Sequence, residues 1–197
     1  LGNLENLNLK SDFLGPNLDF NNGKLRFLIR PYDNSFSGFA DIKTNNLNVE
    51  VNSIFNLTKL IELDVQTFKS PKQDFNLKYE GENNKFSINA DKLSLDSIDI
   101  FEEDNLKIEN FELDLKINDF KIGDMKFSNS IIYAKKLNNF FQKISVSLVG
   151  ENDFHKLSIS EKEANKEFIL ESNYIPGLLN ILDLDFNINK GSIKIEG

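Results

Sequence analysis

Apolar and polar residues alternate one by one along most of this 197-residue chain, and this period of two limits its fold more than any other feature. The clearest run, residues 111–117, reads FELDLKI. Because successive side chains of a strand point to opposite faces, each run predicts a β-strand with one apolar and one polar side. The runs recur about every 8 to 12 residues, with turn residues such as Asn45-Asn46 and Gly123-Asp124 between them, which favours an antiparallel all-β protein.

One short segment has a helical pattern instead. It reads PGLLNIL over residues 176–182, where Pro176 suits a first helical turn and Ser172 or Asn173 lies near the cap. We therefore expect a single short helix near residues 175–183, with one apolar face formed by Leu178, Leu179 and Leu182. No linker rich in Pro, Gly or Ser divides the chain, so residues 1–197 are predicted to be one continuous segment. Because it begins at Leu1, we interpret it as part of a longer protein.

The charge and the rare residue types exclude several classes of function. Asp and Glu number 31 against 23 Lys and Arg, and the net charge of −8 disfavours nucleic acid as a partner. Cys is absent, which excludes thiolate metal sites and Cys nucleophiles, and the single histidine, His155, excludes a multi-histidine metal site. We expect His155 to be an exposed turn residue. No nucleotide-binding or serine-hydrolase motif occurs, so no cofactor is predicted.

Paired carboxylates are the strongest candidates for catalysis. Glu112 and Asp114 are two residues apart, as are Asp183 and Asp185, which on a strand places each pair on one face about 6 to 7 Å apart. Such a pair is compatible with glycoside chemistry, but it is also typical of the solvated face of an acidic protein, which is the interpretation we favour. The acidic run at residues 102–105 lacks the spacing of a Ca²⁺ loop and is read as a solvated turn. We predict that the chain is not an enzyme.

The 18 Phe residues are spread over the whole chain and leave two interpretations open. The apolar faces of the strands either cover one another in a closed β-sandwich or form an open apolar surface that is available to a lipid. The patterning is the same in both cases, and by itself it favours the sandwich. A structural or adhesive β-sandwich with a protein or glycan partner is therefore the alternative function.

The last third of the chain resembles a recurring segment of the AsmA-like family. A series of short amphipathic strands from residue 111 leads into "FILESNYIPGLLNILDLDFNINKGSIKIEG". Gly177 and the three leucines of the expected helix resemble the "G-x-L-L-x-x-L" stretch of that family, here with Gly177 directly before Leu178. Residues 190–197, KGSIKIEG, match its "G-G-x-L-x-x-x-G" strand, with Lys190 in the place of the first Gly.

The resemblance implies a long, twisted antiparallel sheet curled into an open groove with an apolar inside. Proteins of this family are similar to bridge-like lipid transfer proteins: they are anchored in the bacterial inner membrane, extend through the periplasm and guide phospholipid to the outer membrane. Adjoining segments of the same chain would extend the sheet, and no catalytic residues are implied. We expect the groove to be lined by Phe86, Ile88, Leu113, Leu115, Ile117, Ile131, Tyr133, Val146, Leu148 and Ile159, with Leu178, Leu179 and Leu182 as its cap.

Overall fold

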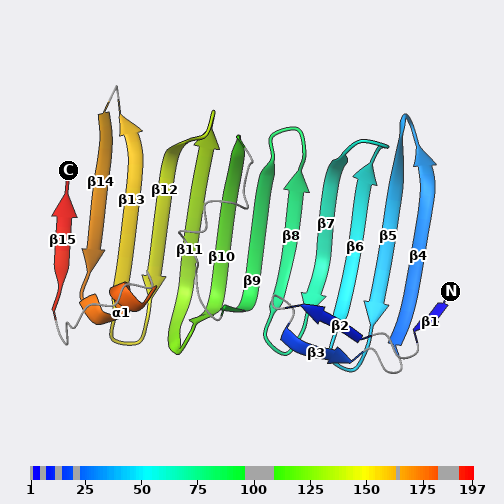
Figure 1. Ribbon diagram of the computed structural model, residues 1–197, viewed down its shortest axis with the longest axis horizontal. Helices are drawn as coiled ribbons and strands as arrows, with labels where there is room; N and C mark the ends of the chain where they lie inside the picture. Colours follow the sequence, from blue (N-terminus) through cyan, green and yellow to red (C-terminus); the bar gives the residue numbers. More distant parts are fainter. Residues whose placement is uncertain are drawn as a thin grey trace. The chain divides into compact units, whose positions relative to one another are not determined.

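The computed structural model describes residues 2–4, 8–11, 15–19, 23–95, 109–162, 165–181 and 191–197 (Figure 1). Its elements are β1 (Gly2–Leu4), β2 (Asn8–Ser11), β3 (Gly15–Asp19), β4 (Gly23–Tyr32), β5 (Ser35–Lys43), β6 (Asn48–Phe55), β7 (Leu60–Lys69), β8 (Asp74–Glu80), β9 (Lys85–Leu95), β10 (Phe111–Ile122), β11 (Met125–Leu137), β12 (Phe140–Val149), β13 (Phe154–Lys162), β14 (Asn165–Ser172), α1 (Ile175–Ile181) and β15 (Ile193–Glu196). The predicted all-β class, with an open antiparallel sheet and one short helix near residues 175–183, is confirmed.

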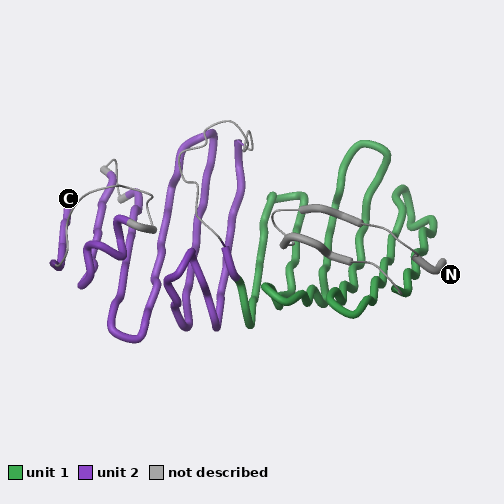
Figure 2. Tube along the Cα trace, turned by 60° about the horizontal axis from the view of Figure 1, so that its bottom comes forward, with its two compact units in different colours: residues 1–93 green, residues 94–197 purple. Residues whose placement is uncertain are grey.

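The chain divides into two compact units, residues 1–93 and 94–197 (Figure 2). In unit 1 the strand order is β1-β4-β5-β6-β7-β8-β9, and β2 pairs with β3 in a separate two-stranded sheet. In unit 2 the order is β10-β11-β12-β13-β14-β15. From β4 onward, each strand within a unit therefore pairs with the next strand in the sequence, which is the arrangement that short turns between antiparallel strands produce.

The turns explain why the strands follow one another so simply. Asp33, Asn84 and Asn138 have positive φ angles of 47°, 47° and 50°, a conformation that Asn and Asp tolerate better than other side chains. Between β6 and β7, the side-chain Oδ1 of Asn56 accepts hydrogen bonds from the amides of Thr58 and Lys59, both at 2.9 Å. These local bonds close the turn between β6 and β7.

Two strands of unit 2 are longer than the alternation predicts. The sequence pattern changes phase after Ile117 and again after Phe127, which suggests that strands end there. In the structure, β10 and β11 run through both points, and β11 has a β-bulge against β12 between Ser128 and Ile131. Asn129, inside this bulge, has a φ angle of 52°. The bulge changes the phase of the alternation without ending the strand.

Each unit has its own group of buried side chains. In unit 1, Leu47, Val65 and Phe68 are buried, and the Phe68 ring stacks on Phe75 with 4.6 Å between ring centroids. In unit 2, the largest fully buried side chain is Phe120, and the other buried hydrophobic residues include Ile117, Ile122, Phe127 and Leu148.

Candidate functional site

Most of the apolar side chains of β4–β9 in unit 1 share one face of the sheet. Directly paired residues of neighbouring strands lie on the same face, so the register shows which side chains form rows across the strands. Three rows cross the six strands β4–β9: Phe27–Ala40–Val51–Val65–Leu77–Ile88, Ile29–Gly38–Ser53–Leu63–Tyr79–Phe86 and Leu25–Ile42–Val49–Phe68–Phe75–Ala90. We call this surface apolar face 1.

Unit 2 has an equivalent surface, which we call apolar face 2. One row is apolar along its whole length across β10–β15, and a second is apolar across β10–β14. The two rows are Leu115–Ile132–Val146–Leu157–Leu170–Ile195 and Leu113–Ala134–Ile144–Ile159–Phe168. A third row is less uniform, because His155 pairs with Leu148 on one side and with Ser172 on the other.

Burial on the apolar faces is uneven. On face 1, Phe27 is 65% exposed and Ile29 is 46% exposed, whereas Ala90 is only 3% exposed. On face 2, Phe111, Leu113 and Ile159 are partly buried. Each face therefore has a buried part and a part where apolar side chains keep contact with solvent.

The register groups most of the predicted groove residues, but it does not bring all ten together. Phe86 and Ile88 lie on face 1, whereas Leu113, Leu115, Ile117, Val146, Leu148 and Ile159 lie on face 2. Ile117 and Leu148 are only 1% and 2% exposed, so within face 2 they belong to the closed core.

The assignment of Ile131 and Tyr133 to the groove is wrong. Ile131 pairs with Lys116 and Tyr133 pairs with Asp114, so both side chains are on the polar face of unit 2. The bulge at Asn129 changes the phase of β11, and the residues that reach face 2 are Ile132 and Ala134. If a strand is assumed to end at the phase change, the alternation in the sequence wrongly places Ile131 and Tyr133 on the apolar face.

The predicted cap is partly described by the structure. Leu178 of α1 is buried and Leu179 is half-buried, whereas Leu182 lies outside the described residues. Helix α1 lies against face 2, because a methyl group added at Gly177 would be 3.3 Å from Cε1 of His155. The backbone amide of Ile175 donates to the carbonyl of Gly191 at 3.0 Å, which ties the start of the helix to the segment before β15.

The expectation that His155 is exposed is wrong, because its side chain is only 3% exposed. The Oγ of Ser172 accepts a hydrogen bond from the backbone amide of Tyr174 at 3.1 Å. The Ser172 hydroxyl also lies 2.8 Å from Nδ1 of His155, to which it can donate. Burial lowers the pKa of His155, and the Asp153 carboxylate, 3.6 Å from Nε2, opposes this shift. Ser172 is itself buried, so its contacts with His155 and Tyr174 stabilise the junction of β13, β14 and α1.

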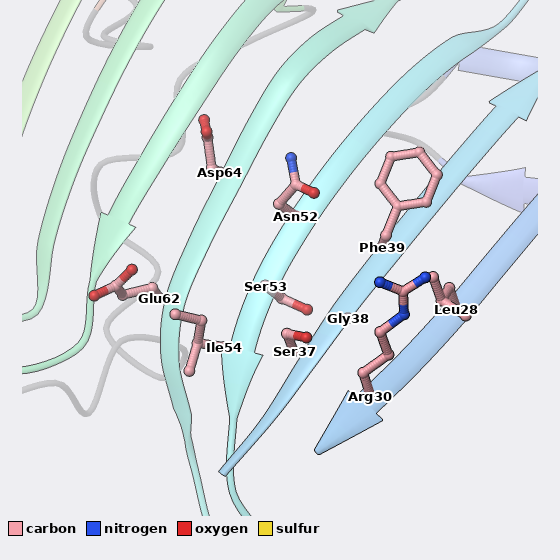
Figure 3. A pocket seen from close by; sticks show the side chains of 10 residues that line it. All are labelled: Leu28, Arg30, Ser37, Gly38, Phe39, Asn52, Ser53, Ile54, Glu62 and Asp64. Atoms are coloured by element: carbon pink, nitrogen blue, oxygen red, sulfur yellow. The ribbon is translucent and has the colours of Figure 1, made fainter. Parts of the chain in front are cut away.

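The polar face of unit 1 contains a hollow of about 440 Å³ over β4–β7 (Figure 3). Two rows of side chains line it: Leu28–Phe39–Asn52–Asp64 and Arg30–Ser37–Ile54–Glu62. The hollow exists because Ser37 is small and lies between the longer side chains of Arg30 and Ile54. None of these eight residues was selected from the sequence, because only the register brings them together.

Several other charges on the polar faces are paired. Asp41 is buried, and burial would raise its pKa, but hydrogen bonding and charge from Arg26, together with the charge of Lys43, hold the pKa below its usual range. The carboxylates of the predicted catalytic pair, Glu112 and Asp114, lie 3.8 Å from Lys135 and Lys116, respectively. Asp183, Asp185 and residues 102–105 lie outside the described residues.

In the part of the chain that the structure describes, no group of three or more acidic or histidine side chains is arranged to hold a metal ion. Over the same residues, no helix has the length and hydrophobicity needed to cross a membrane. No known family model, curated protein or solved structure matches this chain.

Proposed function

We propose that this chain binds the acyl chains of phospholipids along its apolar faces, as a segment of a periplasmic lipid-transfer protein of the AsmA-like type. The observation that carries this proposal is the set of apolar rows, which continue from strand to strand in each unit. In the proposed role the chain guides lipid between the inner and outer membranes and catalyses no reaction.

The dimensions of the rows suit an acyl chain. Six strands about 4.8 Å apart extend a row over about 24 Å. The hydrocarbon of one membrane leaflet is about 15 Å thick, half of a bilayer core of about 30 Å. One row is therefore long enough to accept a whole acyl chain.

The energetics suit movement along the surface. Each methylene removed from water contributes about 0.8 kcal/mol wherever the lining is apolar. A lining of similar aliphatic and aromatic side chains offers nearly the same energy at each position, so a chain can slide without a deep minimum. The half-exposed Phe27 and Ile29 on face 1 are apolar area of the kind that binds such ligands.

Neighbouring residues of β12 provide a matched test. Val146 is on face 2 and Ser147 is on the polar face of the same strand. We expect detergent-free protein to yield phospholipid in organic extracts examined by mass spectrometry. Val146→Asp should lower the amount of bound lipid strongly, because a carboxylate on the apolar face opposes burial of the acyl chain. Ser147→Asp adds the same charge and should leave bound lipid unchanged.

Circular dichroism of both variants separates a loss of binding from a loss of folding. A wild-type protein that is free of lipid and does not bind vesicle-derived phospholipid would contradict the proposal. An equal loss of lipid in both variants, with the fold intact, would show that the binding surface is not face 2.

A further inference from the structure

The hollow on the polar face of unit 1 is built from two kinds of side chain. Arg30, Glu62, Asp64, Asn52 and Ser37 bring donors and acceptors, whereas Phe39, Leu28 and Ile54 bring apolar surface. In Figure 3, Phe39, Asn52 and Asp64 follow one another along the upper row, and Arg30 lies at the β4 end. Its volume of about 440 Å³ is within the range of about 300–1,000 Å³ that is usual for ligand sites.

Some charged groups on the same face are already paired with one another. Lys69 lies 2.7 Å from Asp74, and Arg26 forms an ion pair with Asp41. By contrast, Arg30, Glu62 and Asp64 form no ion pair or side-chain hydrogen bond with another described residue. Their hydrogen-bonding capacity remains available to a ligand.

The separation of these groups explains why they do not neutralise one another. Arg30 and Glu62 stand at opposite ends of one row, three strand spacings or about 14 Å apart at the backbone. Asp64 and Glu62 are two residues apart on β7, or about 7 Å. A ligand that contacts both ends must therefore be extended and must carry polar groups along its length.

The charge balance selects against an anion. The lining of the hollow has one guanidinium, from Arg30, and two carboxylates, from Glu62 and Asp64. Strand β8 adds Lys78 beside Asp64 and Glu80 beside Glu62, one charge of each sign. The net negative charge repels phosphate and carboxylate ligands. Hydroxyl groups both donate and accept, so a polyhydroxylated ligand can bond to Arg30 as an acceptor and to Asp64 as a donor.

Phe39 adds a second requirement, because the ligand must also have an apolar face to contact this ring. Its half-buried ring lies in the same row as Asn52 and Asp64, between Leu28 and the polar end. A sugar ring has an apolar face of C–H groups and an edge of hydroxyls, which match an aromatic ring beside polar side chains.

We propose that this hollow binds a neutral disaccharide, with Phe39 under one sugar ring and Arg30, Asn52 and Asp64 on its hydroxyls. The site is on the face opposite to apolar face 1, so it is separate from the proposed lipid surface. Saccharide binding can therefore be present or absent whatever the outcome of the lipid experiments.

The test is a titration of the isotope-labelled chain with maltose, cellobiose and chitobiose, followed by amide NMR shifts. At least one disaccharide should shift residues of β4–β7 around the hollow, with a dissociation constant in the millimolar range. Asp64→Asn and Arg30→Gln should each weaken this binding about tenfold, which corresponds to about 1.4 kcal/mol. Lys24→Gln removes an exposed cation from the same face of β4, far along the strand, and should have no effect.

Three results would overturn the proposal. One is the absence of shifts around the hollow with all three disaccharides at tens of millimolar. Another is a shift produced by glycylglycine or inorganic phosphate while the disaccharides produce none, which would assign the hollow to a charged ligand. The third is equal disaccharide affinity in Arg30→Gln, Asp64→Asn and Lys24→Gln, because binding would then not use the hollow.

Discussion

Phe111 and Phe120 are on the same strand of unit 2, yet their surroundings differ. Phe120 is fully buried and its ring is 6.4 Å from Phe127, which in turn is 5.8 Å from His155 at the base of α1. Phe111 is only partly buried, and its main aromatic neighbour is Phe141, at an edge-on distance of 6.1 Å. We call these two regions the closed end and the open end of face 2.

The difference between the two ends shows what burial requires in a protein of this kind. An antiparallel sheet with one apolar face buries that face only where another element packs on it. At the closed end, α1 approaches His155 closely because position 177 is glycine. At the open end, Phe111 is only partly buried and keeps apolar area available for a ligand.

The largest effect that should distinguish the two ends is the loss of a Phe ring. Phe120→Ala should lower the free energy of unfolding by about 3–5 kcal/mol, because it removes a fully buried ring and leaves a cavity. Phe111→Ala should cost about 1–2 kcal/mol, because part of that ring already contacts water. Urea denaturation followed by circular dichroism measures both, and equal costs would show that the open end is as closely packed as the other.

Removal of one buried hydroxyl should have the next largest effect. Ser172→Ala leaves Nδ1 of His155 and the amide of Tyr174 without their partner, which should cost about 1–3 kcal/mol. Ser158→Ala on the polar face of β13 is the control and should change stability by no more than about 0.5 kcal/mol. If the two variants have the same unfolding midpoint, the Ser172–His155 bond does not hold the closed end together.

Sequence patterning predicted the strands and the helix because both follow from local periodicity. It failed at Ile131 and Tyr133, where a bulge at Asn129 shifts the phase of a continuing strand. It also failed at His155, because a single imidazole after a turn gives no sign of the helix that later packs on it. Arg30 and Asp64 are 34 residues apart, and only the pairing register of four strands brings them to one hollow.

The closed end should also be the acid-sensitive end. Since burial lowers the pKa of His155 below 6.5, the folded state binds fewer protons than the unfolded state in the interval between the two pKa values. The contribution of His155 to the free energy of unfolding is fully present above pH 6.5. It is lost as the pH falls through the lowered pKa, by at most about 1.4 kcal/mol per pH unit.

Urea denaturation at a series of pH values, with wild type and His155→Phe compared, measures this contribution. The wild type should lose stability on mild acidification more steeply than the variant, which keeps a ring at this position but does not titrate. Parallel curves would assign the acid sensitivity to other groups.

The smallest effect on stability should come from an ion pair of β15 on the polar face of unit 2. Nζ of Lys194 lies 2.8 Å from the Glu196 carboxylate, and the hydrogen bond and charge of Glu196 raise the pKa of Lys194. Both side chains are more than half exposed, so water and salt screen the attraction and holding two long side chains together costs entropy. Lys194→Gln should leave the urea midpoint unchanged. A shift as large as that of Ser172→Ala would mean that β15 is held by its charges, and not by the pairing of Ile193 with Ser172.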